Sequence, residues 1–256
     1  LGLHVAENAS PEIIEQTPAH VLRYVRMYFR PRTPTFYRNE GIRAPAQIKL
    51  NAHMPVPVTF LLDSKAILAK DGTQFTDGNL ARPGVVWHRG AIGLERLSFP
   101  HIYHAAPLHG DDAWRIQSRR QSEVVVPDEL ELAPVLRRIG VRSHAEFETL
   151  RTVLQQQIPA RAADLMRLVE VDTGANWFFK EWTFVERVAA LPDHLMITFH
   201  PSLTPAEFEM HAQLFDAETG EVLLDIMRRL PADSQPKRLR LPSMPNTRRF
   251  RFVLAL

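Results

Sequence analysis

The chain has 256 residues and no cysteine, a length that supports one large or two modest domains without disulfides or metal staples. Hydrophobic residues make up 45% and charged residues 23%, which excludes wholesale disorder and a coiled-coil composition. No apolar run approaches the roughly 18 residues of a membrane span, and the first ten residues lack the basic flank and apolar core of a signal peptide. We therefore expect a soluble, cytoplasmic protein without catalytic thiols or cysteine-based zinc sites.

The formal net charge is +2, but 26 of the 31 basic residues are arginines. The planar guanidinium pairs with phosphate through two hydrogen bonds and stacks on rings. An arginine excess is thus typical of proteins that bind nucleic acid or a pyrophosphate ligand. GC-rich codon usage gives the same excess, so composition leaves both explanations open.

The first part of the chain alternates short apolar runs with Pro and Gly turns. These runs have strand length and are rich in β-branched residues, which favours strands over helices. We predict strands at 21–29, 56–62, 66–68, 123–126 and 138–141. Residues 84–116 lack a sustained period and are rich in His, Gly, Pro and aromatics, so we expect a long functional loop with one short helix.

A helical segment follows. Ser143 and Glu146 have the spacing of a capping box, which predicts a helix over 143–154. Helical spacing of apolar residues continues over 161–171.

Beyond Gly174 the pattern changes to alternation, with a hairpin turn at 216–220. We predict strands at 177–188, 195–200, 208–215, 221–229, 239–241 and 249–254. The sequence thus indicates an α+β protein. We expect it to comprise a first domain at 1–150, connecting helices at 151–174 and a β-rich, sandwich-like accessory domain at 175–256.

Gln121 and Glu123 open an apolar strand pattern. Side chains two residues apart on a strand point to the same face, so this amide and carboxylate project together. The carboxylate could hold a ribose hydroxyl and stabilise positive charge, while the amide orients an acceptor base. The alternative is a solvated strand edge without a function.

Arg32 lies between Pro31 and Pro34. The two prolines restrict the backbone, which holds the guanidinium on a stiff extended loop. The aromatic residues beside it would suit stacking of a ring, and Arg32 would suit clamping of a pyrophosphate. The alternative is an ordinary solvated arginine loop. These neighbouring aromatics are Tyr28, Phe29, Phe36 and Tyr37.

Asp77 and Gly78 mark a tight turn that we expect to expose Thr76 and Asn79.

The segment before Gln121 combines stacking faces with phosphate-binding groups, a mixture typical of loops that hold an extruded or single-stranded base. The alternative is that Trp114 packs in a core and the arginines are solvated. The histidines of this region lack a HExxH spacing, so we expect no metal site. The candidate substrate-binding residues here are His109, Trp114, Arg115, Arg119 and Arg120.

Three segments together, in this order and spacing, resemble the DarT family of DNA ADP-ribosyltransferase toxins over about residues 1–150. They are YFRPRTP at 28–34, FTDGN at 75–79 and RRQSEVVVP at 119–127. The resemblance implies a split-β-sheet ADP-ribosyltransferase fold that binds NAD⁺ in a cleft between two sheets. It further implies release of nicotinamide, transfer of ADP-ribose to a base in single-stranded DNA, a toxin role in anti-phage defence, and a protein antitoxin with ADP-ribosyl-hydrolase activity.

By the same resemblance, Glu123 is the catalytic glutamate and Gln121 is its motif partner at the substrate. Arg32 then acts on the NAD⁺ phosphates and on the transition state. The further NAD-binding candidates are Tyr28, Phe29, Tyr37, Thr76 and Asn79.

Two features depart from the family pattern. Asn79 stands where family members usually carry a histidine after the turn glycine. The first NAD-binding element of the family ends in Gly-Leu, which this chain matches at Gly2 and Leu3. We therefore expect the N-terminal NAD-binding element to be incomplete in this sequence.

The chemistry can also be derived without the family. Breaking the N-glycosidic bond of NAD⁺ builds positive charge on the ribose, and one preorganised carboxylate such as Glu123 offsets about 3 to 4 kcal/mol in the transition state. The same carboxylate could take the proton from an attacking base nitrogen. RNA as the acceptor, protein as the acceptor, and a non-catalytic nucleic-acid-binding module are the alternatives that the sequence leaves open.

Overall fold

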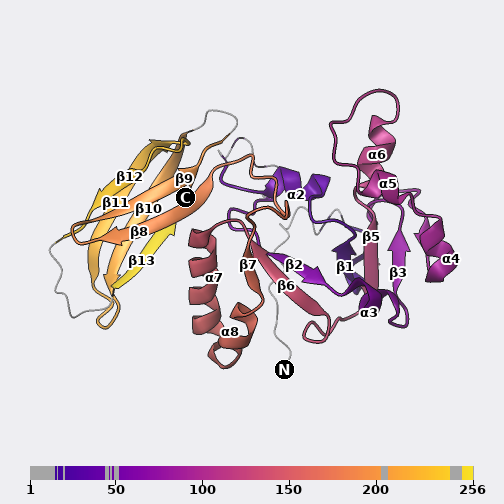
Figure 1. The fold of residues 1–256 in the computed structure, drawn as a ribbon, viewed down its shortest axis with the longest axis horizontal. Coiled ribbons are helices and arrows are strands. Elements are labelled where there is room, and N and C mark those ends of the chain that lie inside the picture. Colours follow the sequence, from indigo (N-terminus) through magenta and orange to yellow (C-terminus); the bar gives the residue numbers. More distant parts are fainter. Residues whose placement is uncertain are drawn as a thin grey trace.

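The computed structural model describes residues 15, 17–19, 21–43, 46, 48, 52–202, 207–242 and 250–255 (Figure 1). Its helices are η1 (Val21–Arg23), α2 (Pro34–Asn39), α3 (Ser64–Leu68), α4 (Gly90–Glu95), α5 (Phe99–Ile102), α6 (Ala113–Arg119), α7 (His144–Gln157) and α8 (Pro159–Met166). The Gly2 and Leu3 match lies outside the described residues.

The described strands mix with these helices along the chain, so the fold is α+β as predicted. They form sheets in the orders β1-β5-β3-β4, β2-β6-β7, β12-β9-β8 and β11-β10-β13. The strands are β1 (Tyr24–Tyr28), β2 (Thr59–Leu62), β3 (Gln74–Thr76), β4 (Trp87–His88), β5 (Glu123–Pro127), β6 (Leu136–Val141), β7 (Val169–Val171), β8 (Phe184–Leu191), β9 (His194–His200), β10 (Glu207–Asp216), β11 (Val222–Pro231), β12 (Lys237–Arg240) and β13 (Phe250–Ala255).

The sheet that contains β1 and β5 has one apolar face and one mixed face, where polar side chains lie beside the buried Val125. β1 pairs antiparallel with β5, so Tyr28 lies opposite Glu123 and Arg26 lies opposite Val125. Residues directly opposite each other share a face, and the mixed face therefore carries Tyr28, Arg26 and Glu123. The other face packs into a core with Phe75 from β3 and helices α3 to α5, and its strand residues are Val25, Met27, Val124 and Val126.

The sheet of β2, β6 and β7 packs against α7 and α8 around a second core. β6 and β7 run parallel, which the intervening helices permit as a crossover. Gly140 on β6 has a steric role, because a Cβ there would lie 2.5 Å from Cε3 of Trp177.

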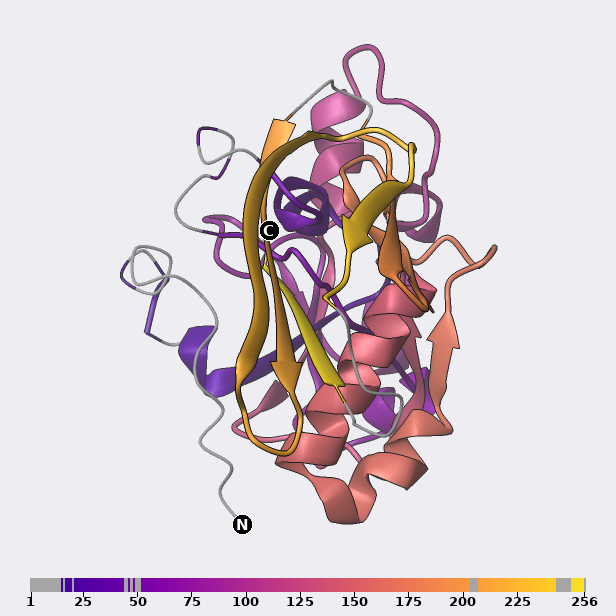
Figure 2. The same cartoon turned by 90° about the vertical axis from the view of Figure 1, so that its left-hand side faces the viewer.

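The two C-terminal sheets share one core. Burial alternates along β9 and β10, so every second side chain of each strand packs inward. Leu195, Ile197 and Phe199 meet Met210 and other β10 residues in that core. Figure 1 shows these sheets at one end of the molecule, the β1 sheet at the other, and α7 with β6 between them. Figure 2 views the molecule from the side of these C-terminal sheets.

Several predicted elements need correction. Residues 66–68 form part of α3, because the carboxylate of Asp63 caps that helix by accepting the Ala66 N–H at 3.0 Å. β7 replaces the end of the helix expected over 161–171, since 169–171 pair with β6. Residues 21–23 form a 3₁₀ turn before β1 instead of its first residues.

The expected loop at 84–116 is more ordered than predicted. It contains β4, α4, α5 and the first turn of α6. Short helices of four to seven residues leave no long period in the sequence. The strand expected from residue 177 begins at Phe184, because the preceding segment is an irregular stretch whose backbone N–H groups are taken up by buried carboxylates.

Candidate active site

Glu123 begins β5 and has no solvent exposure. Arg26 on the neighbouring strand donates from Nε to Oε2 at 2.6 Å and from Nη2 to Oε1 at 2.8 Å. The backbone N–H of Leu80 also donates to Oε1 at 3.0 Å. Burial lowers the pKa of Arg26, but its hydrogen bonds to Glu123 and the charge of that carboxylate raise the pKa above the ordinary value. The two side chains therefore form a bidentate salt bridge.

The turn after β3 extends the chain of polar contacts that begins at Glu123. Arg26 Nη2 donates to Asn79 Oδ1 at 3.4 Å, and Asn79 Nδ2 donates to Gln121 Oε1 at 3.4 Å. The structure thus connects Gln121 to Glu123 through Asn79 and Arg26. Gln121 itself lies in the turn after α6, before β5 begins at Glu123, which corrects the expectation that it opens the strand. Thr76 is buried, which corrects the expectation that the turn exposes it. Its hydroxyl donates to Gly78 O at 2.7 Å and accepts the Glu123 N–H at 3.3 Å.

Two of the candidate aromatics beside the arginine loop lie on opposite faces of the sheet. Tyr28 is the cross-strand partner of Glu123 and remains 36% exposed. Burial and the negative charge of Glu123 raise the pKa of the Tyr28 phenol, which keeps it protonated. Phe29 instead packs in the core, with its ring 5.7 Å from that of Phe99 and 6.3 Å from that of Phe75. The structure therefore does not bring Phe29 to Glu123.

A pocket of about 510 Å³ lies between the turn after β3 and helix α6. Trp114 on α6 is 69% exposed, so it does not pack in a core. Arg115 lies with its Cζ 6.0 Å from the Trp114 ring centroid, and Arg119 forms an ion pair with Asp77. The pocket is lined by residues 77–79, 82–86, 114, 115 and 117–119. His109 is exposed in the loop between α5 and α6.

Arg30 and Arg120 fasten the loop after α5 to the strand ends. Arg30 Nη1 donates to the carbonyls of Ile102 and His104, each at 2.9 Å. Arg120 Nη2 donates to the Ala106 carbonyl at 2.7 Å and to His104 Nδ1 at 2.8 Å. Because a guanidinium is a donor without acceptor capacity, Nδ1 of His104 carries no proton in this arrangement.

These two guanidiniums and that of Arg32 form a cluster of positive charge. Burial and the charges of Arg120 and Arg32 lower the pKa of Arg30 to about 10. Burial and the charge of Arg32 lower the pKa of Arg120 as well. Nε of Arg120 is buried without a hydrogen-bond partner among the described residues. The cluster is thus suited to an anion, which would relieve the mutual repulsion.

Arg32 is positioned by helix α2, which follows it. Thr33 caps α2 by accepting the Phe36 N–H at 3.2 Å. The Arg32 guanidinium lies 5.7 Å from the centroid of the Phe179 ring. Tyr37 packs its ring edge against the same phenylalanine, with centroids 5.1 Å apart. Arg32 and Tyr37 therefore lie at the contact between α2 and the segment that precedes β8.

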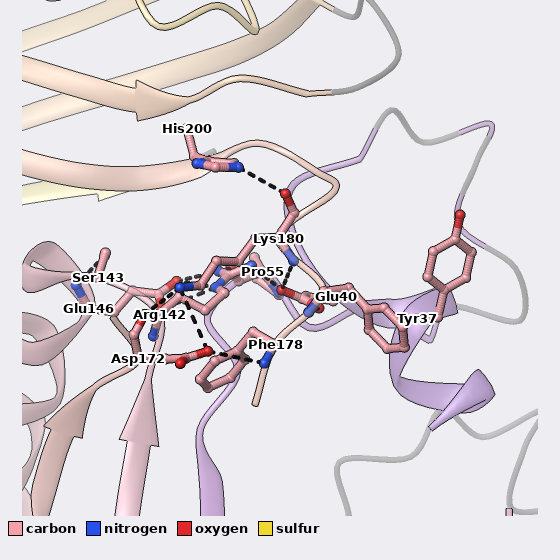
Figure 3. A network of polar contacts seen from close by, with 12 residues as sticks. Tyr37, Glu40, Pro55, Arg142, Ser143, Glu146, Asp172, Phe178, Lys180 and His200 are labelled. Atoms are coloured by element: carbon pink, nitrogen blue, oxygen red, sulfur yellow. Dashed lines mark hydrogen bonds and ion pairs between the residues drawn. The ribbon is translucent and has the colours of Figure 1, made fainter. Parts of the chain in front are cut away.

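Buried charges hold that contact together (Figure 3). Glu40, directly after α2, accepts the N–H groups of Phe179 at 2.8 Å and Lys180 at 3.1 Å. Arg142 forms an ion pair with Glu146 and lies 3.5 Å from Glu40, and all three side chains are almost fully buried. This network ties β6 and α7 to the segment that carries Phe179.

Sequence reasoning missed Arg26 and Arg30. Both lie within a few residues of predicted site residues. Their contact partners are far away in the sequence, and Arg26 and Glu123 are 97 positions apart. The available signal was a charged side chain inside an otherwise apolar strand pattern. In the described part of the chain, no group of three or more His, Cys, Asp or Glu residues could hold a metal ion.

The geometry of the site indicates a class of chemistry. A buried carboxylate held by Arg26, a cluster of arginines and a pocket lined by Asn79 and Trp114 are suited to group transfer from a phosphorylated donor. A family model described as ssDNA thymidine ADP-ribosyltransferase, DarT, matches residues 6–179. The chain therefore belongs to the DarT family of ADP-ribosyltransferases.

The chain is also similar to solved structures of DarT proteins. Thermus sp. 2.9 DarT in complex with NAD⁺ is 20% identical, with 61% of this chain and 73% of that chain covered and a TM-score of 0.46. Thermus sp. 2.9 DarT in complex with ADP-ribosylated ssDNA is 20% identical, with 67% and 80% covered and a TM-score of 0.48. Thermosipho africanus DarTG in complex with ADP-ribose is 16% identical, with 70% and 43% covered and a TM-score of 0.44. No curated protein matches the chain.

Proposed function

We propose that this chain transfers ADP-ribose from NAD⁺ to a thymidine base of single-stranded DNA and releases nicotinamide. The observation that carries the proposal is the buried Glu123 carboxylate, which Arg26 and the Leu80 N–H hold in one orientation. Membership of a family described by this activity supports it. The complexes of Thermus DarT with NAD⁺ and with ADP-ribosylated ssDNA are consistent with the same donor and acceptor.

The arginine cluster fits the diphosphate of NAD⁺. Arg30, Arg32 and Arg120 repel one another, and the buried Nε of Arg120 is a donor without a partner among the described residues. A diphosphate would supply the missing acceptors and negative charge. When bound, NAD⁺ supplies an electrophilic ribose carbon whose bond to nicotinamide breaks. Tyr28, beside Glu123, could face the ribose or the nicotinamide ring.

Glu123 is proposed to act twice. As the bond to nicotinamide breaks and its electron pair leaves with the ring nitrogen, positive charge grows on the ribose, and the carboxylate stabilises it by about 3 to 4 kcal/mol. The acceptor nitrogen of the base then bonds to the same carbon, and its proton passes to the carboxylate. Gln121, linked to Glu123 through Asn79 and Arg26, is proposed to orient the acceptor base.

The pocket beside α6 fits a single-stranded nucleic acid. Trp114 offers an exposed face on which a base can stack, and Arg115 and Arg82 offer phosphate contacts at the same pocket. Arg119, paired with Asp77, keeps the pocket wall fixed. His109, in the adjoining loop, is a further candidate contact for the DNA.

The proposal extends to the organisation of the chain. We assign the β1 sheet and strands β2 and β6 to a split-sheet ADP-ribosyltransferase domain at 1–150. The connecting helices at 151–174 are followed by β7, which adds to the sheet of β6, and a sandwich-like accessory domain takes up 175–256. In the described residues, no helix has the length and apolarity that a membrane span requires. We also propose a toxin of the cytoplasm, active in anti-phage defence, that a protein antitoxin counters by removing ADP-ribose.

Transfer of labelled ADP-ribose tests the proposal. The protein is incubated with labelled NAD⁺ and, separately, single-stranded DNA, RNA and bulk protein, and each acceptor is isolated. We expect label on the DNA, a loss of at least about a hundredfold for Glu123→Gln, and a higher KM for NAD⁺ in Arg32→Ala. Glu129→Gln, an exposed glutamate just after β5, is the matched control. Label on RNA or protein alone, or equal transfer by Glu123→Gln, contradicts the proposal.

A further inference from the structure

We propose that Arg26 is a positioning residue that fixes the orientation of the Glu123 carboxylate for the transfer reaction. The inference rests on the proposed function, because it assumes that Glu123 is the reacting carboxylate. Its physical basis is the geometry of the salt bridge between β1 and β5, in which two nitrogens of one guanidinium contact both oxygens of one carboxylate.

The hydrogen bonds leave a defined vacancy on the carboxylate. An ionised carboxylate has about four lone-pair positions. Oε1 uses two of them, for Arg26 Nη2 and the Leu80 N–H, and Oε2 uses one for Arg26 Nε. Within the part of the chain that the structure describes, one lone pair on Oε2 is therefore left for a substrate hydroxyl or proton. Because the fork fixes rotation of the carboxylate, this lone pair has one direction.

Burial makes the guanidinium necessary. The Glu123 side chain is 0% exposed, whereas that of Arg26 keeps 29% of its surface exposed. A buried carboxylate without a partner charge is strongly disfavoured. Arg26 thus supplies the positive charge that faces the buried Glu123 carboxylate, and the outer edge of its guanidinium remains open to solvent and to ligand.

The lengths of the contacts indicate which part moves for the substrate. The Arg26 to Glu123 bonds are 2.6 and 2.8 Å, while the bonds that Asn79 makes to Arg26 and Gln121 are both 3.4 Å. Hydrogen bonds near 3.4 Å are weak. Because the Glu123 side chain is buried, a ligand reaches it at the lowest cost by displacing Asn79. The bidentate contact between Arg26 and Glu123 then stays intact.

Kinetics separate positioning from binding. We expect Arg26→Gln to lower kcat for transfer to DNA by about a hundredfold, the loss typical of a group misplaced by about 1 Å. The KM for NAD⁺ should change by less than about threefold, because Arg26 contacts Glu123 and lies outside the arginine cluster. Arg26→Lys should recover part of kcat, since lysine restores the charge without the fork. Arg23→Gln, which breaks an exposed pair with Asp128, is the control.

Chemical rescue distinguishes positioning from a general loss of structure. Guanidinium chloride at tens of millimolar should raise kcat of Arg26→Ala at least about tenfold, while urea at the same concentration and added guanidinium on the wild type should not. An Arg26→Gln enzyme with wild-type kcat contradicts the proposal. So does Arg26→Ala that guanidinium leaves unchanged.

A double-mutant cycle tests the pair without any activity measurement. Urea unfolding midpoints are compared for the wild type, Arg26→Gln, Glu123→Gln and the double variant. If the Arg26–Glu123 pair exists in solution, the double variant should unfold at nearly the same urea concentration as the less stable of the two single variants. Additive midpoints overturn the inference even if transfer is observed, whereas a wild type that binds NAD⁺ but transfers nothing overturns the proposed function instead.

Discussion

Replacement of Arg142 by alanine tests whether the buried charge network stabilises the protein. Both Arg142 and its partners Glu40 and Glu146 are removed from solvent, with side-chain exposures of 0%, 1% and 4%. The guanidinium also lies 4.3 Å from the centroid of the Phe184 ring. Arg142→Ala leaves two buried carboxylates without their cation, so we expect unfolding to become easier by about 3 to 5 kcal/mol.

Urea denaturation, followed by two probes whose transitions must coincide, measures this change. Arg138→Ala, on the strand β6 that ends just before Arg142, is the matched control. Its pair with Glu170 is 56% and 46% exposed and should contribute less than about 1 kcal/mol. A loss below about 1 kcal/mol for Arg142→Ala would refute the reasoning. An equal loss of unfolding free energy in Arg142→Ala and Arg138→Ala would also refute the reasoning, because burial of the ion pair would then not determine the loss.

Three further predictions concern the pocket, the core and a helix cap. Trp114→Ala should raise the KM for single-stranded DNA by about 5- to 150-fold, the loss of one stacked base, with kcat at saturating DNA retained in steady-state assays. Gly140→Ala should destabilise the fold by about 1 to 3 kcal/mol in urea, because its Cβ meets Trp177. Hydrogen bonds from the Ala66 N–H and Arg137 lower the pKa of Asp63 below 3.8. The stability advantage over Asp63→Asn should therefore be full above about pH 4 and vanish as pH falls through the lowered pKa, and an advantage that grows on acidification contradicts this.

Local patterns predicted the elements whose causes are local. Ser143 caps α7 by accepting the Glu146 N–H at 3.2 Å, as its position before an apolar period indicated. Even there the capping box is incomplete, because the Glu146 carboxylate turns to Arg142 and accepts its N–H at 3.0 Å. Burial raises the pKa of Glu146 despite the opposing charge of Arg142, an effect that depends on tertiary packing and leaves no sequence signal.

The candidate site was predictable in part for the same reason. The strand that begins at Glu123 followed from its apolar residues, whereas Gln121 lies in the turn after α6 and reaches the site through Asn79. The partner of Glu123 depended on the register between β1 and β5, which pairs Tyr28 with Glu123 and brings Arg26 within reach. A shift of one residue would turn Arg26 to the other face, and register between strands 97 residues apart cannot be read from one sequence. The position of Arg32 against Phe179, 147 residues along the chain, is likewise a tertiary contact that the sequence does not show.

The most direct test of the proposed activity is the intact mass of a DNA oligonucleotide after incubation with the protein and NAD⁺. A single-stranded oligonucleotide that contains thymidine should gain the mass of one ADP-ribosyl group, and a matched oligonucleotide without thymidine should not. Glu123→Gln should abolish the gain while Glu129→Gln preserves it. An unmodified thymidine oligonucleotide with the wild-type protein, or a mass gain that Glu123→Gln leaves unchanged, would contradict the assignment of Glu123 as the reacting carboxylate of a DNA ADP-ribosyltransferase.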